Sequence, residues 1–195
     1  AAFIGVADPA VANPDGSAFT MPLSPGNPLK PTDAPLPYGI APLNTPQLIT
    51  SWTQFTTKFG DFQAGNNILA HAVFGFFNNG GTACFVTRVA NAGDVAQVRA
   101  ALRQFEAIDE IAIVAVPGAV DAGVQEEVIS HCENMKDRFA IIDGQQTTTI
   151  TAAEIQGTVG DSNFAALYFP WLQVFDPVTK ADPATRGLIF VPPSG

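Results

Sequence analysis

The chain has 195 residues, 47% of them hydrophobic and 14% charged, and its formal net charge at pH 7 is −9. This composition predicts a folded protein with one well-filled core and excludes an intrinsically disordered chain. A surface of that sign repels phosphate backbones, so no nucleic-acid partner is expected. Membrane insertion is not expected either, because no apolar run approaches the ~18 residues that a spanning helix needs.

The first residues have the pattern of a buried strand, and the segment after them does not. Residues 2–7 read AFIGVA, an apolar and partly β-branched run. Residues 8–42 hold nine of the sixteen prolines and show neither helical nor strand periodicity. Because proline fixes φ and removes a donor, this segment cannot join a sheet interior. It is predicted to be a proline-rich surface excursion, with a ligand for a polyproline-binding groove as the weaker alternative.

Two helices and two strands are predicted between residues 46 and 89. Residues 46–50 form a short strand, and Ser51 then caps a helix that Gly60 ends. Asn66 or Asn67 caps a longer helix, which ends at 79–81, and residues 83–89 form a β-prone strand. The longer helix has a broad apolar face made by Ile68, Leu69, Ala72, Val73, Phe76 and Phe77.

Helices and strands then alternate. Asp94 caps a helix with apolar residues at helical spacing, and residues 111–116 form a nearly continuous apolar strand. Asp121 caps the next helix, and residues 139–142 form the strand after it. Because parallel strands need such crossovers, the alternation predicts a right-handed α/β sheet with helices on its faces. The inward residues of the two helices are Val95, Val98, Leu102, Phe105, Val124, Val128, Cys132 and Met135.

The rest of the chain is less regular. Residues 145–163 form a polar loop region with a possible short helix at 152–156. Residues 164–175 form a long aromatic strand interrupted by Pro170, and a loop at 176–187 leads to a last strand at 188–191. The predicted fold class is therefore α/β, with a mixed, largely parallel sheet flanked by helices in one domain over residues 1–195.

No motif indicates catalysis, a cofactor or a metal. Phosphate-binding glycine loops and the nucleophile-elbow motif are absent from the sequence. Asp143 ends an apolar strand and is the best-placed carboxylate, but without a partner it is predicted to be a turn residue. The Asn-Asn-Gly-Gly run at 78–81 is predicted to end a helix, where the dipole disfavours anions. The buried or rim residues predicted to do no chemistry are His71, His131, Cys84 and Cys132.

The charged side chains are predicted to be solvated. Glu106, Asp109 and Glu110 form an acidic face beside a helix end. An exposed cation pairs with an acidic neighbour only weakly, so no specific role is expected for these residues. The cations in this group are Lys58, Arg99, Arg103, Lys136 and Arg138.

Seven blocks of sequence, in order, resemble the core of tail sheath proteins from contractile phage tails and related injection systems. The blocks are AAFIGVA, PLNTPQLITSWTQFTTKFG, LAHAVFGFFNNGGTACFVTRV, ALRQFEAIDEIAIVAVPG, HCENMKDRFAIIDG, FAALYFPWLQVFDP and IFVPPSG. The resemblance implies a non-enzymatic structural subunit. Such subunits stack as hexameric rings around an inner tube and contract to drive that tube through a target envelope.

The resemblance also implies partners and a location. The partners are neighbouring sheath subunits, the inner tube protein, and baseplate and terminator proteins. The location is a virion tail or injection particle, assembled in the bacterial cytoplasm. The resemblance implies terminal arms that add strands to neighbours' sheets. Sheath proteins usually have an N-terminal arm before the AAFIGVA strand and a C-terminal domain after VPPSG, so the chain is expected to be a core fragment.

Two other functions fit the residues and are kept as alternatives. The first is a small α/β enzyme or nucleotide-binding domain, which the fold class permits. The second is a non-contractile adhesion or capsid-like module.

Overall fold

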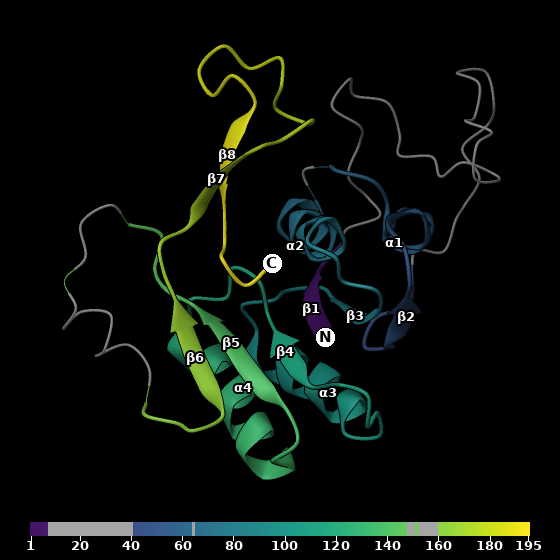
Figure 1. The fold of residues 1–195 in the computed structure, drawn as a ribbon, viewed down its shortest axis with the longest axis vertical. Coiled ribbons are helices and arrows are strands. Elements are labelled where there is room, and N and C mark those ends of the chain that lie inside the picture. The colour runs from purple at the N-terminus through teal and green to yellow at the C-terminus, as the bar shows by residue number, and fades with distance from the viewer. Residues whose placement is uncertain (8–40, 64, 148–150, 152–159) are drawn as a thin grey trace.

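The computed structural model describes residues 1–7, 41–63, 65–147, 151 and 160–195. The described chain forms a six-stranded sheet, four helices and a separate two-stranded hairpin (Figure 1). The elements are β1 (Ala2–Val6), β2 (Gln47–Ile49), α1 (Trp52–Phe59), α2 (Asn67–Asn78), β3 (Cys84–Val89), α3 (Val95–Phe105), β4 (Ile113–Ala115), α4 (Ala122–Met135), β5 (Phe139–Asp143), β6 (Ala165–Tyr168), β7 (Leu172–Phe175) and β8 (Leu188–Val191).

The six-stranded sheet has the order β2-β3-β1-β4-β5-β6. Every neighbouring pair is parallel except β2 with β3, which is antiparallel. The parallel pairs need the helical crossovers that the alternating sequence predicted. The predicted mixed, largely parallel α/β sheet is therefore confirmed.

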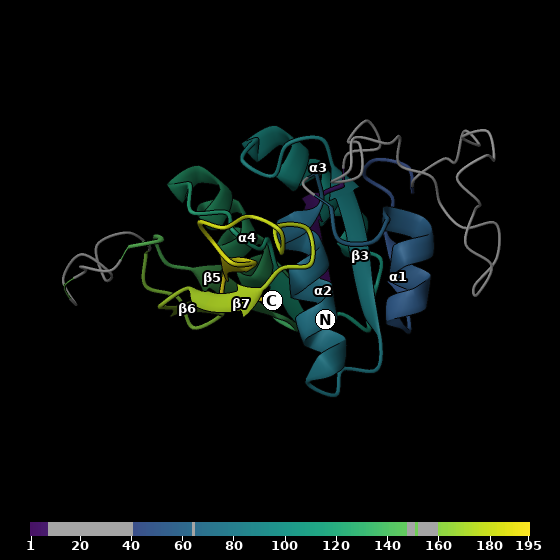
Figure 2. The ribbon, with the colours of Figure 1, turned by 90° about the horizontal axis from the view of Figure 1, so that it is seen from above.

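Two separate cores lie on the two faces of this sheet. Ala2 and Ile4 of β1 point into a core shared with α3 and α4, whereas Phe3 points into the other core with α1 and α2. The alternation follows from the pleat of a strand, which turns successive side chains to opposite faces. Figure 2 shows α3 and α4 on one side of the strands and α2 on the other.

Helix α2 lies unusually close to β1, and a glycine permits this. A Cβ atom at Gly5 would lie 2.9 Å from Leu69 Cδ1, closer than side chains normally approach. Leu69 itself is buried against the strand. A larger residue at position 5 would force the Leu69 side chain or the helix to shift.

The second core covers only half of the sheet. Helices α1 and α2 pack against β2, β3 and β1, and no described helix covers the same face of β4, β5 and β6. Ile113 and Tyr168 on that face are exposed, and Ile141 is half-buried. Parallel sheets are normally covered on both faces, so this open half-face sets the molecule apart from a closed α/β domain.

Three of the predicted helix starts are confirmed by their hydrogen bonds. The side chains of Ser51, Asp94 and Asp121 each accept from backbone N–H groups in the first turn of α1, α3 and α4. Asn66 precedes α2 as predicted, but its side chain makes no capping bond. Its Oδ1 accepts from Gln63 N, and its Nδ2 donates to carbonyls at the end of α1.

Two predicted strands differ in extent. The apolar run at 111–116 is a strand only over Ile113–Ala115. The aromatic run at 164–175 is divided at Pro170 between two sheets, because β6 pairs with β5 while β7 pairs with β8. Proline cannot donate to a ladder, and the chain leaves the main sheet at that point.

Other predictions lie partly or wholly outside the described residues. These are the proline-rich excursion at 8–42, of which 41 and 42 are described, and the polar loop region at 145–163, of which 145–147, 151 and 160–163 are described, with its short helix at 152–156. None of the helices in the described ranges has the length and apolarity that a membrane span requires.

Two phenylalanines of one aromatic cluster give a test of the second core. Phe55 is 0% exposed and stacks on Trp52, whereas Phe74 is 39% exposed and meets Trp52 edge to face. Phe55→Ala should lower the free energy of unfolding by about 3–5 kcal/mol, because it leaves a cavity. Phe74→Ala is the control and should cost at most about half as much. Equal losses in urea unfolding would contradict this placement of the core.

Candidate assembly surface and its buried anchors

The hairpin of β7 and β8 stands apart from the main sheet, at the top of Figure 1. Its register pairs Gln173 with Phe190 and Phe175 with Leu188, which places these four side chains on one face. On that face Phe175 is 58% exposed, Leu188 41% and Phe190 44%. We call these three residues the hairpin face.

An exposed apolar cluster of this kind marks a contact surface. Scattered apolar side chains are normal on a protein surface, but contiguous large ones usually mark an interaction site. On the opposite face of the hairpin, Val174 and Ile189 are half-buried and Val191 is buried, whereas Leu172 at the base is 49% exposed. Both faces of the hairpin are thus apolar, as expected of a strand pair covered on two sides.

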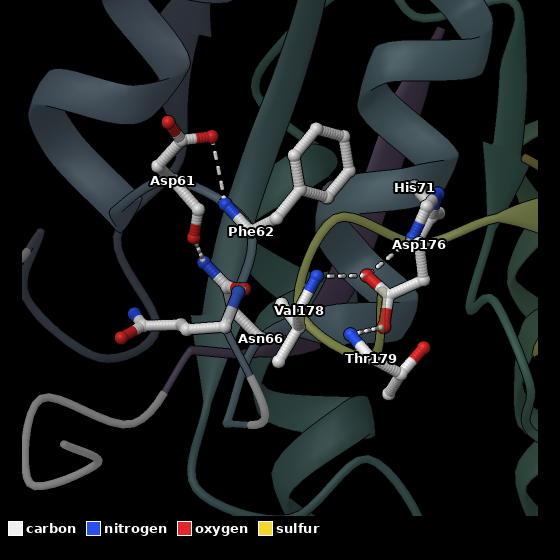
Figure 3. Close-up of polar contacts among 8 residues, drawn as sticks. Asp61, Phe62, Asn66, His71, Asp176, Val178 and Thr179 are labelled. Carbon is white, nitrogen blue, oxygen red and sulfur yellow. Dashed lines mark hydrogen bonds and ion pairs between the residues drawn. The ribbon is translucent and has the colours of Figure 1, made fainter. Parts of the chain in front are cut away.

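The tip of the hairpin is tied to α2 through two buried polar side chains. Asp176 follows β7 directly and is 0% exposed, and its Oδ1 lies 3.3 Å from His71 Nε2 (Figure 3). A carboxylate only accepts hydrogen bonds, so Nε2 is the donor. The His71 ring packs on Phe62, with 4.6 Å between ring centroids. We call this pair the His71–Asp176 latch.

Asp176 also organises the loop that follows it. Its carboxylate accepts from the backbone N–H groups of Val178 and Thr179, both at 3.2 Å. Its own N–H donates to Gly187 O at 2.6 Å, which closes the loop between the two strands. A side chain that accepts from the amides two and three residues ahead forms an Asx-type turn.

The segment after β8 is held by a second buried carboxylate. Asp143, at the end of β5, accepts from Ser194 N at 2.9 Å, from Ser194 Oγ at 2.6 Å and from Gly118 N at 2.9 Å. Burial raises the pKa of this carboxyl, and the hydrogen bonds from Ser194 and Gly118 oppose that effect. The predicted turn residue is therefore an anchor for the C-terminal segment.

The end of this segment also packs directly on α2. A Cβ atom at Gly195 would lie 2.1 Å from Ala72 Cβ, and one at Gly75 would lie 3.1 Å from the Gly195 carbonyl carbon. The backbone of residue 195 thus lies in a groove that small residues leave on the helix. His71, Ala72 and Gly75 together make α2 the common support of the hairpin and of the segment after it.

The other candidates from the sequence lie apart from this surface. Cys84 and Cys132 are buried in different cores, and burial raises the pKa of each thiol to about 12. Neither is a reactive thiol. The glycines at 80 and 81 follow the end of α2, as predicted.

The prediction of a solvated Arg138 is wrong. Its side chain is buried, and it donates to Phe105 O at 2.8 Å and to Ile108 O at 3.3 Å. These carbonyls lie at and beyond the end of α3, where a cation is favourable. His131 is also buried, with its Nε2 3.5 Å from Arg138 Nη1, and burial followed by the Arg138 charge lowers its pKa.

The remaining charged side chains are mostly at the surface. Arg99 bridges α3 and α4 by donating from Nε to Glu127 Oε2 at 2.9 Å. Lys58 is half-buried and donates to Gln47 Oε1 at 3.0 Å. The residues whose predicted exposure is confirmed are Arg99, Arg103, Glu106, Asp109, Glu110 and Lys136.

A hollow of about 550 Å³ lies where an α/β enzyme would hold its ligand, at the carboxyl ends of the parallel strands. It is lined mainly by backbone and apolar side chains, including Val6, Ile68 and Trp171, with Asp121 at its border. The Asp121 carboxylate is already used to cap α4. Within the described ranges, no three His, Cys, Asp or Glu side chains gather closely enough to hold a metal ion.

The sequence did not identify the His71–Asp176 latch or the role of Ser194. His71 and Asp176 are 105 positions apart, and only the fold brings them together. One signal was present, since an Asp directly after an apolar strand and before Pro177 is typical of a turn that the side chain stabilises.

The fold is thus that of an α/β domain with a projecting apolar hairpin, and the solved structures that are similar to it include two from one particle. One is a chain of the helical sheath of the anti-feeding prophage (AFP) in its contracted state, with a TM-score of 0.60 over 99% of this chain and 19% identity. The other is a chain of the AFP baseplate, 6-fold symmetrised, with a TM-score of 0.57 over 99% of this chain and 20% identity.

This chain spans less than half of either matched chain, 42% and 43% of their lengths. No protein-family model matches it, and no curated protein matches its sequence. At these identities the likeness shows the fold, so this chain has the fold of the matched part of the AFP sheath chain.

The Asp143 anchor can be tested by an isosteric change. In Asp143→Asn, one of the two side-chain positions becomes a donor and faces the N–H of either Gly118 or Ser194. Leaving a buried donor unsatisfied should lower the free energy of unfolding by about 1–3 kcal/mol. Asp109→Asn at an exposed site is the control and should stay within about 0.5 kcal/mol of wild type.

The stability difference between wild type and Asp143→Asn is expected to depend on pH, and Asp109→Asn again serves as the control. Because the pKa of Asp143 is raised in the folded state, the native protein holds this proton more tightly than the unfolded chain. Its contribution to stability is full below the unfolded pKa of about 3.9 and declines as pH rises through the folded pKa. The loss of unfolding free energy caused by Asp143→Asn should therefore shrink between pH 4 and pH 8. A loss that grows over this range would contradict burial as the main influence on the pKa of Asp143.

Proposed function

We propose that this chain is the core part of a contractile sheath subunit. In this function it assembles into stacked hexameric rings around an inner tube, and contraction of the rings drives the tube through a target envelope. The observation that carries the proposal is the shared fold, over 99% of this chain, with a chain of the AFP helical sheath in its contracted state. The seven ordered sequence blocks that resemble tail sheath proteins support it independently.

A structural role agrees with how the buried polar groups are used. Asp143, Asp176 and His71 join separate parts of the chain, and both carboxylates already accept hydrogen bonds from backbone N–H groups and from Ser194 or His71. Catalytic groups instead need a free position facing a substrate. The proposed subunit is therefore non-enzymatic and needs no cofactor.

The hairpin face is proposed to contact a neighbouring subunit of the same lattice. The chain carries a net charge of −9, so two copies repel each other at long range. Buried apolar area has to offset that repulsion, and the hairpin face supplies large apolar side chains for this contact. Inner tube, baseplate and terminator proteins are the further proposed partners, in a virion tail or an injection particle assembled in the bacterial cytoplasm.

Assembly can be tested in the complete gene product that contains this chain. Negative-stain microscopy of the purified protein should show rings or tubes, and their absence would contradict the proposed function. A double change, Phe175→Ser with Phe190→Ser, should abolish tubes because it removes the apolar contact.

The control for that double change is Gln173→Ser, which alters an exposed polar residue on the same side of the hairpin. It should assemble like wild type and keep its unfolding free energy within about 0.5 kcal/mol. The double variant should lose about 1–3 kcal/mol and stay folded, because each phenylalanine is only about half exposed. A large loss of stability in the double variant would mean instead that the protein's own chain covers the hairpin face.

The alternative of a nucleotide-binding or enzymatic domain predicts a ligand-dependent gain in stability. A ligand at 100 times its dissociation constant stabilises the native state by about 2.7 kcal/mol. We expect no shift of the thermal midpoint with ATP, NAD or GTP, each with and without Mg²⁺. A clear rise with any of them would favour the alternative and point to the hollow beside α2.

A further inference from the structure

We infer that the His71–Asp176 latch is a positioning device, which fixes the direction in which the hairpin face points from the body of the subunit. The inference rests on the proposed function for its biological meaning, because that function places the neighbouring subunit on the hairpin face. The latch itself is argued from contacts within this chain.

The hairpin depends on anchors because its own strands hold it weakly. Each strand has four residues, and the two pair only with each other. An isolated two-stranded hairpin is marginal in water, and four large apolar side chains of this one are exposed, those of Leu172, Phe175, Leu188 and Phe190. Its position relative to the sheet must therefore be set by contacts at its ends.

The base and the tip of the hairpin are held differently. At the base, Trp171 Nε1 donates to Gly144 O at 2.7 Å, and Ser194 is bonded to Asp143 beyond β8. These contacts fix where the hairpin leaves the body, and β8 also lies against α2 near Val191. At the tip, the polar contact with the body that the described residues show is the one between His71 and Asp176.

The latch holds the tip of the hairpin against a rigid part of the molecule. His71 is on α2, a helix pressed onto β1 through Gly5, so the imidazole is mounted on a rigid support. Phe62 packs against the ring and limits its rotation. Asp176 is fully buried and joined to the loop by three backbone hydrogen bonds, so holding its carboxylate also holds the loop.

Without the imidazole, Asp176 would keep its loop bonds and lose its contact with α2. A fully buried carboxylate is costly when a partner is removed, so the loop should move to let water reach it. That movement swings the hairpin about its base, and the main sheet stays folded. Glutamine can restore the contact, because its Nε2 reaches about where the imidazole Nε2 lies and also donates.

The test compares His71→Leu with His71→Gln by amide hydrogen exchange, using the whole 195-residue chain. In the leucine variant, peptides covering residues 172–191 should exchange at least tenfold faster than in wild type. In the glutamine variant they should exchange at the wild-type rate. Peptides from β1 and β3 should be unchanged in both variants.

Three results would overturn the inference. They are unchanged exchange over residues 172–191 in His71→Leu, equal acceleration in both variants, and acceleration that includes β1 and β3. The last result would make His71 a general stabiliser of the core. If the leucine variant does not fold, His71→Ala replaces it, because alanine removes the ring without adding apolar volume, and the same criteria apply.

The link to assembly is measured separately in the complete gene product. His71→Leu should reduce the yield of tubes at least fivefold, and His71→Gln should assemble like wild type. Normal assembly by a leucine variant with a freed hairpin would show that the latch does not position a lattice contact. If wild type itself forms no tubes, the proposed function fails, and the exchange comparison still decides whether the latch exists.

Discussion

Two buried carboxylates hold the part of this chain that leaves the main sheet. Asp143 binds the segment after β8 through Ser194, and Asp176 holds the hairpin tip against His71. A buried carboxylate is stable only when its hydrogen-bonding positions are filled, so each side chain dictates where its partners must lie. The direction of the hairpin, and with it the hairpin face, follows from these two requirements.

Helix α2 supports both the hairpin and the segment that follows it. One of its faces packs on β1, where Gly5 permits close approach, and it contacts the C-terminal region through His71, Ala72 and Gly75. A displacement of the hairpin would therefore act on a rigid helix and not on a flexible loop. This arrangement suits a subunit that carries force between neighbours, since close-packed elements transmit strain.

The exposed apolar surfaces agree with a subunit that functions within an assembly. No described helix covers the face of β4, β5 and β6 opposite α3 and α4, where Ile113 and Tyr168 are exposed, and the hairpin exposes Phe175, Leu188 and Phe190. A domain that worked alone would bury such residues, since exposing them forgoes hydrophobic stabilisation. In the proposed lattice, these exposed apolar residues contact neighbouring subunits.

The sequence by itself determined the elements and the class of fold. Apolar periodicity and the caps Ser51, Asp94 and Asp121 placed the helices, and the alternation of helix and strand predicted the parallel sheet, because these signals act over a few residues. Tertiary structure alone decided the rest. It buried Arg138 at the end of α3, divided the 164–175 run between two sheets, and paired His71 with Asp176 across 105 positions. Such contacts depend on how elements stack in space, and no local pattern encodes which distant partner a buried polar group will meet.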